Sequence, residues 1–401
     1  MKKIIIYLFL LLSLTTPVFA DDSIDLGESE TSILYETSMD SSSEPIINSK
    51  NVIVLDRKTL LPLYEKDAYS KVAMASTTKI LTCIIALENC ALNEVVTVSK
   101  KAATVSGSTL GLTSNMKLSM NDLIYGLMLR SGNDCAIAIA EHISGSVEDF
   151  SVLMNQKASS LGLTNSNFVT PHGLDNPNHF TTAYELAILT DYALKNQKFL
   201  EIVSSKTYTI SLNGYPRTLS NTNELLGTTQ GVYGVKTGFT FEAGRCLVSA
   251  CKRNNLDIIV VVLGADTKRI RTKDSLSLIN YTFNTYKYVN IESTLNSSFN
   301  NYLSYFENSY YLEKTLDKPI LELATIDNYT FPLSDTDSLN LHTQIYTIDS
   351  FTPNIKPGSV VGKLHLYCKD KLLCEVDIIQ RNQLIKNDWK YYFKNIFKCY
   401  K

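Results

Sequence analysis

Residues 76–87, Ser-Thr-Thr-Lys-Ile-Leu-Thr-Cys-Ile-Ile-Ala-Leu, are the stretch on which the interpretation of this chain depends. If a helix begins at Ser76, Lys79 lies one turn further on and the two side chains share a face. The apolar residues 80–87 predict that this helix is buried through the middle of a domain. A serine hydroxyl needs an adjacent base to become a nucleophile, and a lysine kept away from water can lose its proton and serve as that base. Taken alone, the stretch fits an N-cap serine and a surface lysine better, so the other motifs have to decide.

A second motif, Ser131-Gly132-Asn133, lies between two apolar runs at residues 123–129 and 136–140. The pattern predicts a short polar turn between two buried helices, with the Ser131 hydroxyl and the Asn133 amide facing inward. On its own, a helix cap with Asn133 as a turn residue would be favoured.

A third motif, Lys236-Thr237-Gly238, lies in a strand-like segment, and residues 245–251 alternate like a neighbouring strand. Lys236 supplies positive charge and Thr237 a hydroxyl for a substrate carboxylate, while Gly238 allows the backbone to approach a ligand closely. The order Ser-x-x-Lys, Ser-x-Asn, Lys-Thr-Gly indicates acyl transfer through a serine ester.

With these motifs the chain resembles the low-molecular-mass D-alanyl-D-alanine carboxypeptidases, a family of serine penicillin-binding proteins. The resemblance includes Gly173-Leu174-Asp175 and the stretches 154–158, 179–183 and 221–226, and it covers about residues 45 to 385. It implies an α/β (α+β) fold: a serine DD-peptidase/β-lactamase-like domain with an antiparallel sheet flanked by helices. A small β-rich C-terminal domain and a terminal amphipathic helix would follow.

The resemblance also implies roles for the residues of the first two motifs. Ser76 resembles the acylated nucleophile and Lys79 its base. Ser131 and Asn133 resemble the pair that relays protons and holds the substrate amide. The substrates would be peptidoglycan stem peptides ending in D-Ala-D-Ala, and β-lactams would be covalent inhibitors.

In the third motif, Lys236 and Thr237 resemble the residues that bind the terminal D-alanine carboxylate, next to Gly238. The oxyanion hole of the family would use the backbone N–H of Ser76 and that of Phe239 or of the residue after it.

The two ends of the chain suggest export and attachment to a membrane surface. Two lysines precede the apolar residues 4–14, and a small residue, Ala20, stands at the expected cleavage position of a signal peptide. Near the C-terminus, aromatic and apolar residues recur at close to helical period around Trp389, and lysines repeat every fourth position from Lys386. A basic amphipathic helix of this kind is typical of a membrane-surface segment, and packing on its own domain is the alternative. The predicted location is outside the cytoplasmic membrane, at its outer face.

These observations divide the chain into five parts. The predicted parts are a signal peptide (1–20), a flexible acidic linker (21–49), the catalytic domain (50–290), a β-rich domain (291–381) and the membrane-surface helix (382–401).

Composition narrows the possible partners. The net charge of −2, with no basic patch outside the tail, argues against nucleic acid. No Cys/His grouping has metal-ligand spacing, so neither a metal nor a cofactor is predicted. Most of the eight cysteines fit buried apolar positions, although Cys368 and Cys374 could face each other across a predicted hairpin turn at residues 368–372 and form a disulfide.

Other functions remain open at this point. A Ser-His-Asp hydrolase would need His172 or His179 as its base, but the chain has no Gly-x-Ser-x-Gly elbow, and both histidines fit loop positions better. A β-lactamase would share all three motifs, yet residues 167–182 contain no glutamate to activate the deacylating water. An endopeptidase acting on cross-links and a catalytically silent cell-wall scaffold are the remaining alternatives.

Overall fold

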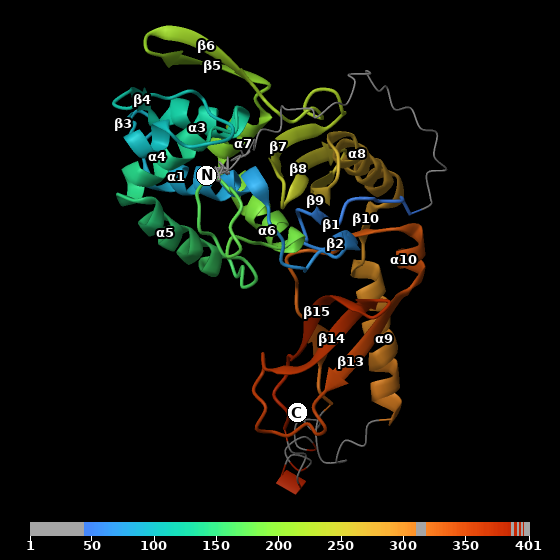
Figure 1. Ribbon diagram of the computed structural model, residues 1–401. Coiled ribbons are helices and arrows are strands. Elements are labelled where there is room, and N and C mark those ends of the chain that lie inside the picture. The colour runs from blue at the N-terminus through green and yellow to red at the C-terminus, as the bar shows by residue number, and fades with distance from the viewer. Residues whose placement is uncertain (1–43, 310–317, 386–388, 391–392, 394–395, 397–401) are drawn as a thin grey trace, which may run out of the picture. The chain divides into compact units, whose positions relative to one another are not determined.

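The computed structural model describes residues 44–309 and 318–385, and residues 389, 390, 393 and 396 of the C-terminal tail (Figure 1). The predicted signal peptide and most of the predicted acidic linker lie outside the described residues. The chain divides into two compact units, Met1–Thr282 and Phe283–Lys401.

The first unit is built on a five-stranded antiparallel sheet. In spatial order its strands are β2 (Pro62–Lys66), β1 (Asn51–Asp56), β9 (Leu256–Ala265), β8 (Gly244–Arg253) and β7 (Val232–Thr240). The two segments predicted as central strands are confirmed, because β1 and β9 are neighbours in the middle of the sheet, with Ile53 opposite Val261. Both of these side chains are fully buried, as the apolar runs require.

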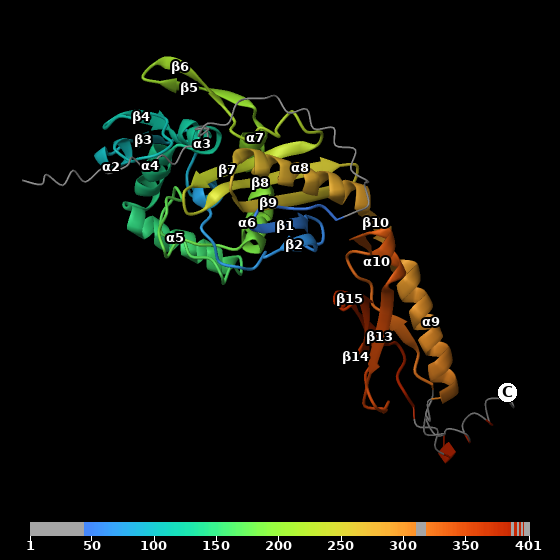
Figure 2. The ribbon, with the colours of Figure 1, turned by 45° about the vertical axis from the view of Figure 1, so that its right-hand side comes forward.

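Helices lie on both sides of this sheet. Figure 2 shows α8 across one face of the strands and α6 behind them. The helical elements are η1 (Ala75–Thr78), α1 (Lys79–Asn89), α2 (Lys100–Ala103), α3 (Met120–Leu129), α4 (Asn133–Ser144), α5 (Val147–Ser160), α6 (Ala183–Leu194), α7 (Gln197–Ser204) and α8 (Lys268–Thr285). Helix α1 is buried from Lys79 to Ala86, which confirms the core helix that its sequence predicted.

Caps define where these helices begin and end. The Thr182 hydroxyl accepts the N–H of Glu185 at the start of α6, and Ser119 does the same for Asp122 at the start of α3. Gly145, with φ +81°, ends α4 in the left-handed conformation.

Two small ribbons complete the first unit. β3 (Val95–Thr97) pairs with β4 (Lys117–Ser119), and β5 (Thr207–Leu212) pairs with β6 (Tyr215–Ser220). The β5–β6 ribbon projects from the body of this unit, at the top of Figure 1.

The second unit is rich in strands. Its four-stranded antiparallel sheet has the order β11 (Leu321–Leu323), β15 (Lys371–Gln380), β14 (Val360–Cys368), β13 (Leu341–Thr347). The remaining elements are β10 (Lys287–Asn290), paired with β12 (Thr330–Leu333), and the helices α9 (Glu292–Ser309) and α10 (Asp335–Leu339).

The turn between β14 and β15 is shorter than the turn predicted at residues 368–372. Cys368 lies opposite Lys371, and Cys374 lies opposite Leu366, so the two cysteines do not face each other across the strands. Both are free thiols, so the disulfide that the sequence left as the less favoured alternative is absent because of this register.

At its N-terminal end, the first unit begins before Lys50. Ile47 and Ser49 are buried, and the Ser49 backbone N–H and hydroxyl donate to the Asp274 carboxylate of α8 at 2.7 and 2.6 Å. The last residues of the predicted flexible linker are therefore packed on the first unit.

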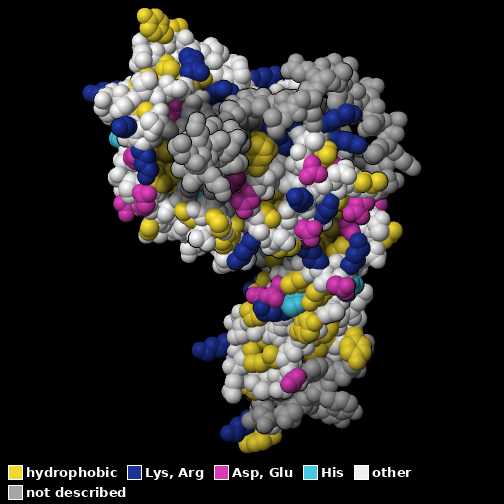
Figure 3. Space-filling model, in the orientation of Figure 1, with side chains coloured by type: hydrophobic (Ala, Val, Ile, Leu, Met, Phe, Trp, Pro, Cys, Tyr) yellow, Lys and Arg dark blue, Asp and Glu magenta, His cyan; other side chains and the backbone are white. Residues whose placement is uncertain are grey.

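The C-terminal helix is described at only a few positions, where the tail is helical and Trp389 is exposed. Residues 382–385 of the predicted membrane-surface helix are described and are not helical, and Leu384 is buried, so the helix does not begin at residue 382; the other positions of the tail lie outside the described residues. Within the part of the chain that the structure covers, no helix is both long and apolar enough to cross a bilayer. On the face drawn in Figure 3, acidic and basic side chains are interspersed.

Candidate active site

The nucleophile candidate lies in a 3₁₀ turn rather than in the first turn of an α-helix. Ser76 belongs to η1, and α1 begins only at Lys79. Ala75, directly before the serine, has φ +48°, a left-handed conformation that costs a non-glycine residue free energy and is found preferentially at functional sites. In this turn Ser76 is buried, with 8% of the residue exposed. Ser76 and Lys79 nevertheless lie close together, as predicted.

The Lys79 amine has three oxygen neighbours. Its Nζ lies 2.7 Å from Ser76 Oγ, 2.8 Å from Asn133 Oδ1 and 2.8 Å from the carbonyl oxygen of His172. Two of these are carbonyl oxygens that only accept, whereas the serine hydroxyl can also donate. A neutral amine, with two protons and one lone pair, fits this arrangement fully if its lone pair faces Ser76.

Electrostatics favour this neutral form. Complete burial lowers the pKa of Lys79 well below its usual value, and the nearby positive charge of Lys236 lowers it further. Lys79 is therefore suited to accept a proton from the Ser76 hydroxyl.

The second motif faces the first from the turn between α3 and α4. Asn133 is the first residue of α4, and its side-chain amide bridges Lys79 Nζ and the carbonyl oxygen of Ser106, which it reaches at 2.7 Å. Ser131, at φ +62°, presents its hydroxyl to Lys236 Nζ at 3.0 Å. The turn thus connects both lysines of the site.

The third motif lies on β7, at the edge of the sheet beside η1. Lys236 is 1% exposed and also donates to the carbonyl oxygen of Thr237 at 2.9 Å. A Cβ atom at Gly238 would stand 3.0 Å from the backbone nitrogen of Ser76, so the glycine permits the close approach of strand and nucleophile. Phe239, the next residue, is half-buried, and its ring lies under the Arg245 guanidinium at 3.9 Å. All eight predicted site residues therefore belong to three segments that the fold brings together.

One residue that the sequence analysis did not single out organises the wall of the site. Asp134 is 1% exposed, and its two carboxylate oxygens accept four backbone N–H groups at 2.9 Å. Three of these come from residues 110–112 and one from Cys135. In the sequence, the position of Asp134 directly after Asn133 could have drawn attention to it. The loop whose N–H groups it binds, however, is more than twenty residues away.

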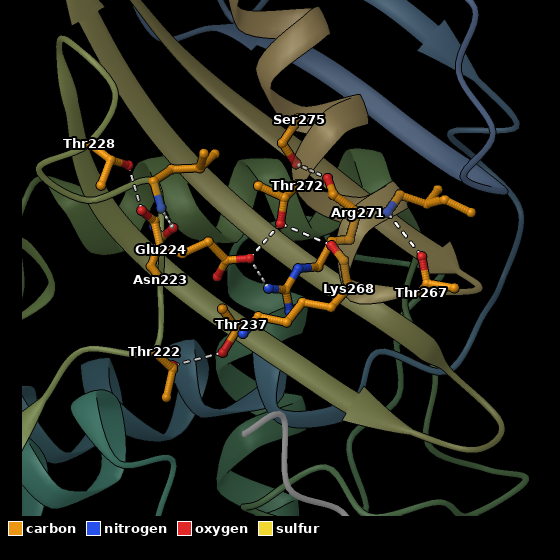
Figure 4. Close-up of polar contacts among 12 residues, drawn as sticks. Thr222, Asn223, Glu224, Thr228, Thr237, Thr267, Lys268, Arg271, Thr272 and Ser275 are labelled. Atoms are coloured by element: carbon orange, nitrogen blue, oxygen red, sulfur yellow. Dashed lines mark hydrogen bonds and ion pairs between the residues drawn. The ribbon is translucent and has the colours of Figure 1, made fainter. Parts of the chain in front are cut away.

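Thr237 and Glu224 each make side-chain contacts that the sequence did not indicate (Figure 4). The Thr237 hydroxyl lies 2.8 Å from that of Thr222. Two residues later, Glu224 pairs with Arg271 of α8 at 2.5 Å and accepts a hydrogen bond from Thr272. Arg271 lies in the buried interior, and its positive charge lowers the pKa of Glu224 against the opposing effect of burial. No pattern in the sequence connects positions 224 and 271.

The two loop histidines shape the site. His172 contributes its carbonyl oxygen to Lys79, and burial, with the Lys79 charge, lowers the pKa of its ring to about 3. His179 accepts the N–H of Val169 on Nδ1 and shares a hydrogen bond with Thr78 Oγ1 at 2.8 Å. Burial first, and then Lys79, lower its pKa to about 4. Both rings are neutral at physiological pH and act as loop supports, as the sequence favoured.

The loop of His172 touches the nucleophile turn directly. At Gly173, with φ +85°, a Cβ atom would stand 1.9 Å from the carbonyl oxygen of Ala75. Only glycine fits this contact.

Comparisons with known proteins agree with this geometry. The family model described as D-alanyl-D-alanine carboxypeptidase (peptidase S11) matches residues 38–267. The D-alanyl-D-alanine carboxypeptidase DacA of Haemophilus influenzae is 30% identical over 359 residues, covering 86% of each chain. The chain belongs to the D-alanyl-D-alanine carboxypeptidase family.

Other relatives match over a shorter part. The carboxypeptidase DacF of Bacillus subtilis is 34% identical over 251 residues, which cover 61% of this chain and 64% of that protein. Among solved structures, penicillin binding protein 5 of H. influenzae gives a TM-score of 0.67 at 26% identity, covering 85% of this chain and 99% of the other.

Proposed function

We propose that this protein is a serine D-Ala-D-Ala carboxypeptidase, which removes the terminal D-alanine from peptidoglycan stem peptides through an acyl-enzyme on Ser76. The observation that carries the proposal is the buried Lys79 amine, whose two carbonyl partners leave its lone pair for the Ser76 hydroxyl at 2.7 Å. Family membership supports the same substrate class.

The first half of the reaction forms the ester. Lys79 takes the proton of Ser76 Oγ as the oxygen attacks the carbonyl carbon between the two D-alanines. The oxyanion that develops is stabilised by the backbone N–H groups of Ser76 and Phe239. The Lys236 ammonium and the Thr237 hydroxyl bind the terminal carboxylate, beside Gly238.

The second half releases the products. Lys79 gives up the proton that it took from Ser76, and Ser131, whose hydroxyl contacts Lys236 Nζ, relays that proton to the amide nitrogen of the leaving D-alanine, while Asn133 holds the peptide amide of the substrate. The C–N bond breaks and D-alanine departs. Water then attacks the ester carbonyl and gives up a proton to Lys79, which is neutral again. The ester C–O bond breaks, the proton passes from Lys79 to Ser76 Oγ, and the shortened peptide leaves with a free carboxylate.

A β-lactam would enter the same sequence at the ester-forming step. Its strained amide presents a carbonyl to Ser76 and its carboxylate to Lys236 and Thr237, and the ring-opened acyl-enzyme has no departing amine. We therefore infer that β-lactams inhibit this enzyme covalently. The missing glutamate in residues 167–182 favours a slowly hydrolysed ester over β-lactamase activity.

The test is D-alanine release from a Lys-D-Ala-D-Ala peptide, measured for the wild-type protein, for Ser76→Ala and for the exposed-serine control Ser70→Ala. Release that is lost only in Ser76→Ala would support the proposal. Penicillin labelling without release would indicate an endopeptidase instead, and neither labelling nor release would indicate a silent scaffold.

We further propose that the protein acts outside the cytoplasmic membrane and is held at its outer face by residues 382–401. The support is the periodic lysine and aromatic pattern, together with exposed Trp389 and Phe393 at helical positions. Each lysine near an anionic surface would contribute about 1 kcal/mol. Deleting residues 386–401 should move the protein from the membrane to the soluble fraction, and a truncated form that still sediments with membranes would contradict the anchor.

A further inference from the structure

A cluster of three potential metal ligands lies at the far ends of the two helices that carry the reacting groups. Cys90 is the C-cap of α1, His142 is in the last turn of α4, and Glu94 follows in the turn after α1. The Cys90 sulfur, a Glu94 carboxylate oxygen and a His142 ring nitrogen all lie within 4.8 Å of one another. Lys79 and Asn133 are the first residues of the same two helices.

We propose that Cys90, Glu94 and His142 bind a Zn²⁺ ion, which joins the C-terminal ends of α1 and α4.

The donor set suits zinc. Thiolate, imidazole and carboxylate are its three usual protein ligands, and tetrahedral zinc places neighbouring ligand atoms about 3.5 Å apart. His142 Nε2 and Glu94 Oε2 are already 3.1 Å apart, so the ion needs only small side-chain movements. An ion pair between these two residues accounts for their contact but not for the sulfur beside them. Their side chains are 28% and 41% exposed, which leaves the fourth coordination position open to water.

The backbone holds the ligands in place without the ion. Glu94 closes a turn in which its own N–H donates to the carbonyl oxygen of Ala91 at 3.0 Å, while its carboxylate accepts the Ala91 N–H at 2.5 Å. Its carbonyl oxygen accepts the N–H of Met120, the first residue of α3. Cys90 is fixed as the helix cap by donating its N–H to Ala86. Rigid elements that preorganise the ligands lower the entropic cost of binding.

The ends of the helices add an electrostatic reason. A helix C-terminus carries a partial negative charge, and α1 and α4 bring two such ends to one place. A cation is therefore favoured there even before ligation.

Zinc would displace a proton from the site. A free cysteine thiol is protonated at neutral pH. Binding converts it to thiolate, and the proton goes to solvent, so that affinity should rise with pH.

The sequence pattern indicates no metal site because the third ligand is 48 positions from the second, and only the packing of α4 against α1 brings it near. The prediction concerns a structural ion, separate from the serine chemistry. A helix rises about 1.5 Å per residue, so the 11 residues of α1 place the ion about 16 Å from Lys79 along the helix.

The experiment uses the full chain, purified without a tag in detergent. Zinc binding is measured by competition with a chromophoric chelator, and Co²⁺ is added in parallel because a cobalt–thiolate bond gives a charge-transfer band in the near ultraviolet. We expect one zinc per chain and the thiolate band. Cys90→Ser should abolish the band, and Glu94→Gln and His142→Ala should each weaken zinc by about tenfold or more.

The matched controls are Cys374→Ser and His342→Ala, a half-buried thiol and an exposed imidazole of the second unit. Both should bind zinc as the wild type does. Zinc should also raise the thermal unfolding midpoint of the wild type and the controls, but not of the three cluster variants. Glu94→Gln and His142→Ala alter partly exposed side chains and keep the test valid if Cys90→Ser fails to fold. Zinc affinity that is the same in all variants, or cobalt binding without the thiolate band, would overturn the proposal.

Discussion

At the scale of single residues, the burial of Lys79 is what favours the neutral amine that can act as a base. Its ammonium form has no carboxylate among the three oxygens around Nζ, so it is disfavoured in the folded protein. The same burial that creates a base must then reduce stability. We therefore expect replacement of Lys79 to change both the rate of acylation and the stability of the fold.

The first concerns rate. Because burial lowers the pKa of Lys79, acylation should already be fast at pH values where an ordinary lysine is protonated, and should slow as the pH falls through the lowered pKa. Lys79→Arg stays protonated, so acylation should fall by about 10²- to 10⁴-fold at every pH. The rate constant for labelling by a fluorescent penicillin, measured across pH, checks both expectations. An unchanged rate in the arginine variant would remove Lys79 as the base.

The second concerns stability. In the unfolded chain Lys79 binds a proton up to about pH 10.5. In the folded chain it loses that proton at a lower pH, so its contribution to the free energy of unfolding rises with pH between the two pKa values. Lys79→Met should stabilise the protein, most strongly at the acidic end of this window, while abolishing labelling. Denaturant unfolding at several pH values measures this, and a destabilised methionine variant would contradict it.

His179 should make the fold sensitive to acid. Its pKa is about 4 when folded and about 6.5 when unfolded, so the unfolded state binds the proton first as the pH falls. Stability should decline from pH 6.5 to pH 4 by about 3 kcal/mol for this group. His179→Gln should flatten that part of the pH profile of the unfolding free energy. If the slope between pH 6.5 and 4 is the same in both proteins, His179 titrates normally.

At the scale of elements, the loop at residues 110–112 is attached to α4 through one carboxylate. Asp134→Ala leaves four buried N–H groups without an acceptor, and we expect a loss of about 3 kcal/mol or more. Asp134→Asn keeps one oxygen, which serves two of the four, and should lose about half as much. Chemical unfolding gives the free energies, and equal losses in the two variants would contradict the bond count.

The contact between the His172 loop and η1 can be tested with two glycines. Gly173→Ala places a methyl group against the Ala75 carbonyl, which must move the nucleophile turn, so penicillin labelling should fall by at least tenfold. Gly162→Ala is the matched control, since it has φ +73° and nothing within 4 Å. It should cost about 1 kcal/mol of stability from backbone strain and leave labelling unchanged. Equal effects on labelling would show that the turn is insensitive to this contact.

The elements also show how far the sequence could predict the site. The apolar run after Lys79 and the alternation around Lys236 were sufficient for the helix, the strands and the eight motif residues. The 3₁₀ turn at Ser76 was not predictable, because it depends on the left-handed Ala75 and on the carbonyl contact with Gly173. Asp134 and the Glu224–Arg271 pair were missed because their partners come from distant segments. Hydrogen bonds between distant segments produce no repeating pattern of residue types in the sequence.

At the scale of the whole molecule, the division into two units separates the chemistry from the β-rich part. All eight predicted site residues belong to Met1–Thr282. The family resemblance predicted a second domain of this type, and its strand pairs followed from alternating segments such as residues 360–367. The hairpin register, which decides that Cys368 and Cys374 stay apart, could not be read from alternation alone, because a shift of two positions keeps the same side chains on the same face of the sheet.

The position of β9 in the sheet has a consequence for synthesis. β9 lies between β1 and β8, so the first strand of the unit has no connection to the strand of the third motif until residues 256–265 have been made. A ribosome-bound or partly exported chain therefore cannot assemble the reactive centre early, since its closure is a long-range event.

A chain ending at Asn255 should take up no fluorescent penicillin, whereas one ending at Asn290 should be labelled. Covalent labelling would then report when folding is complete after export. Labelling of the shorter chain would show that the sheet can close without its middle strand.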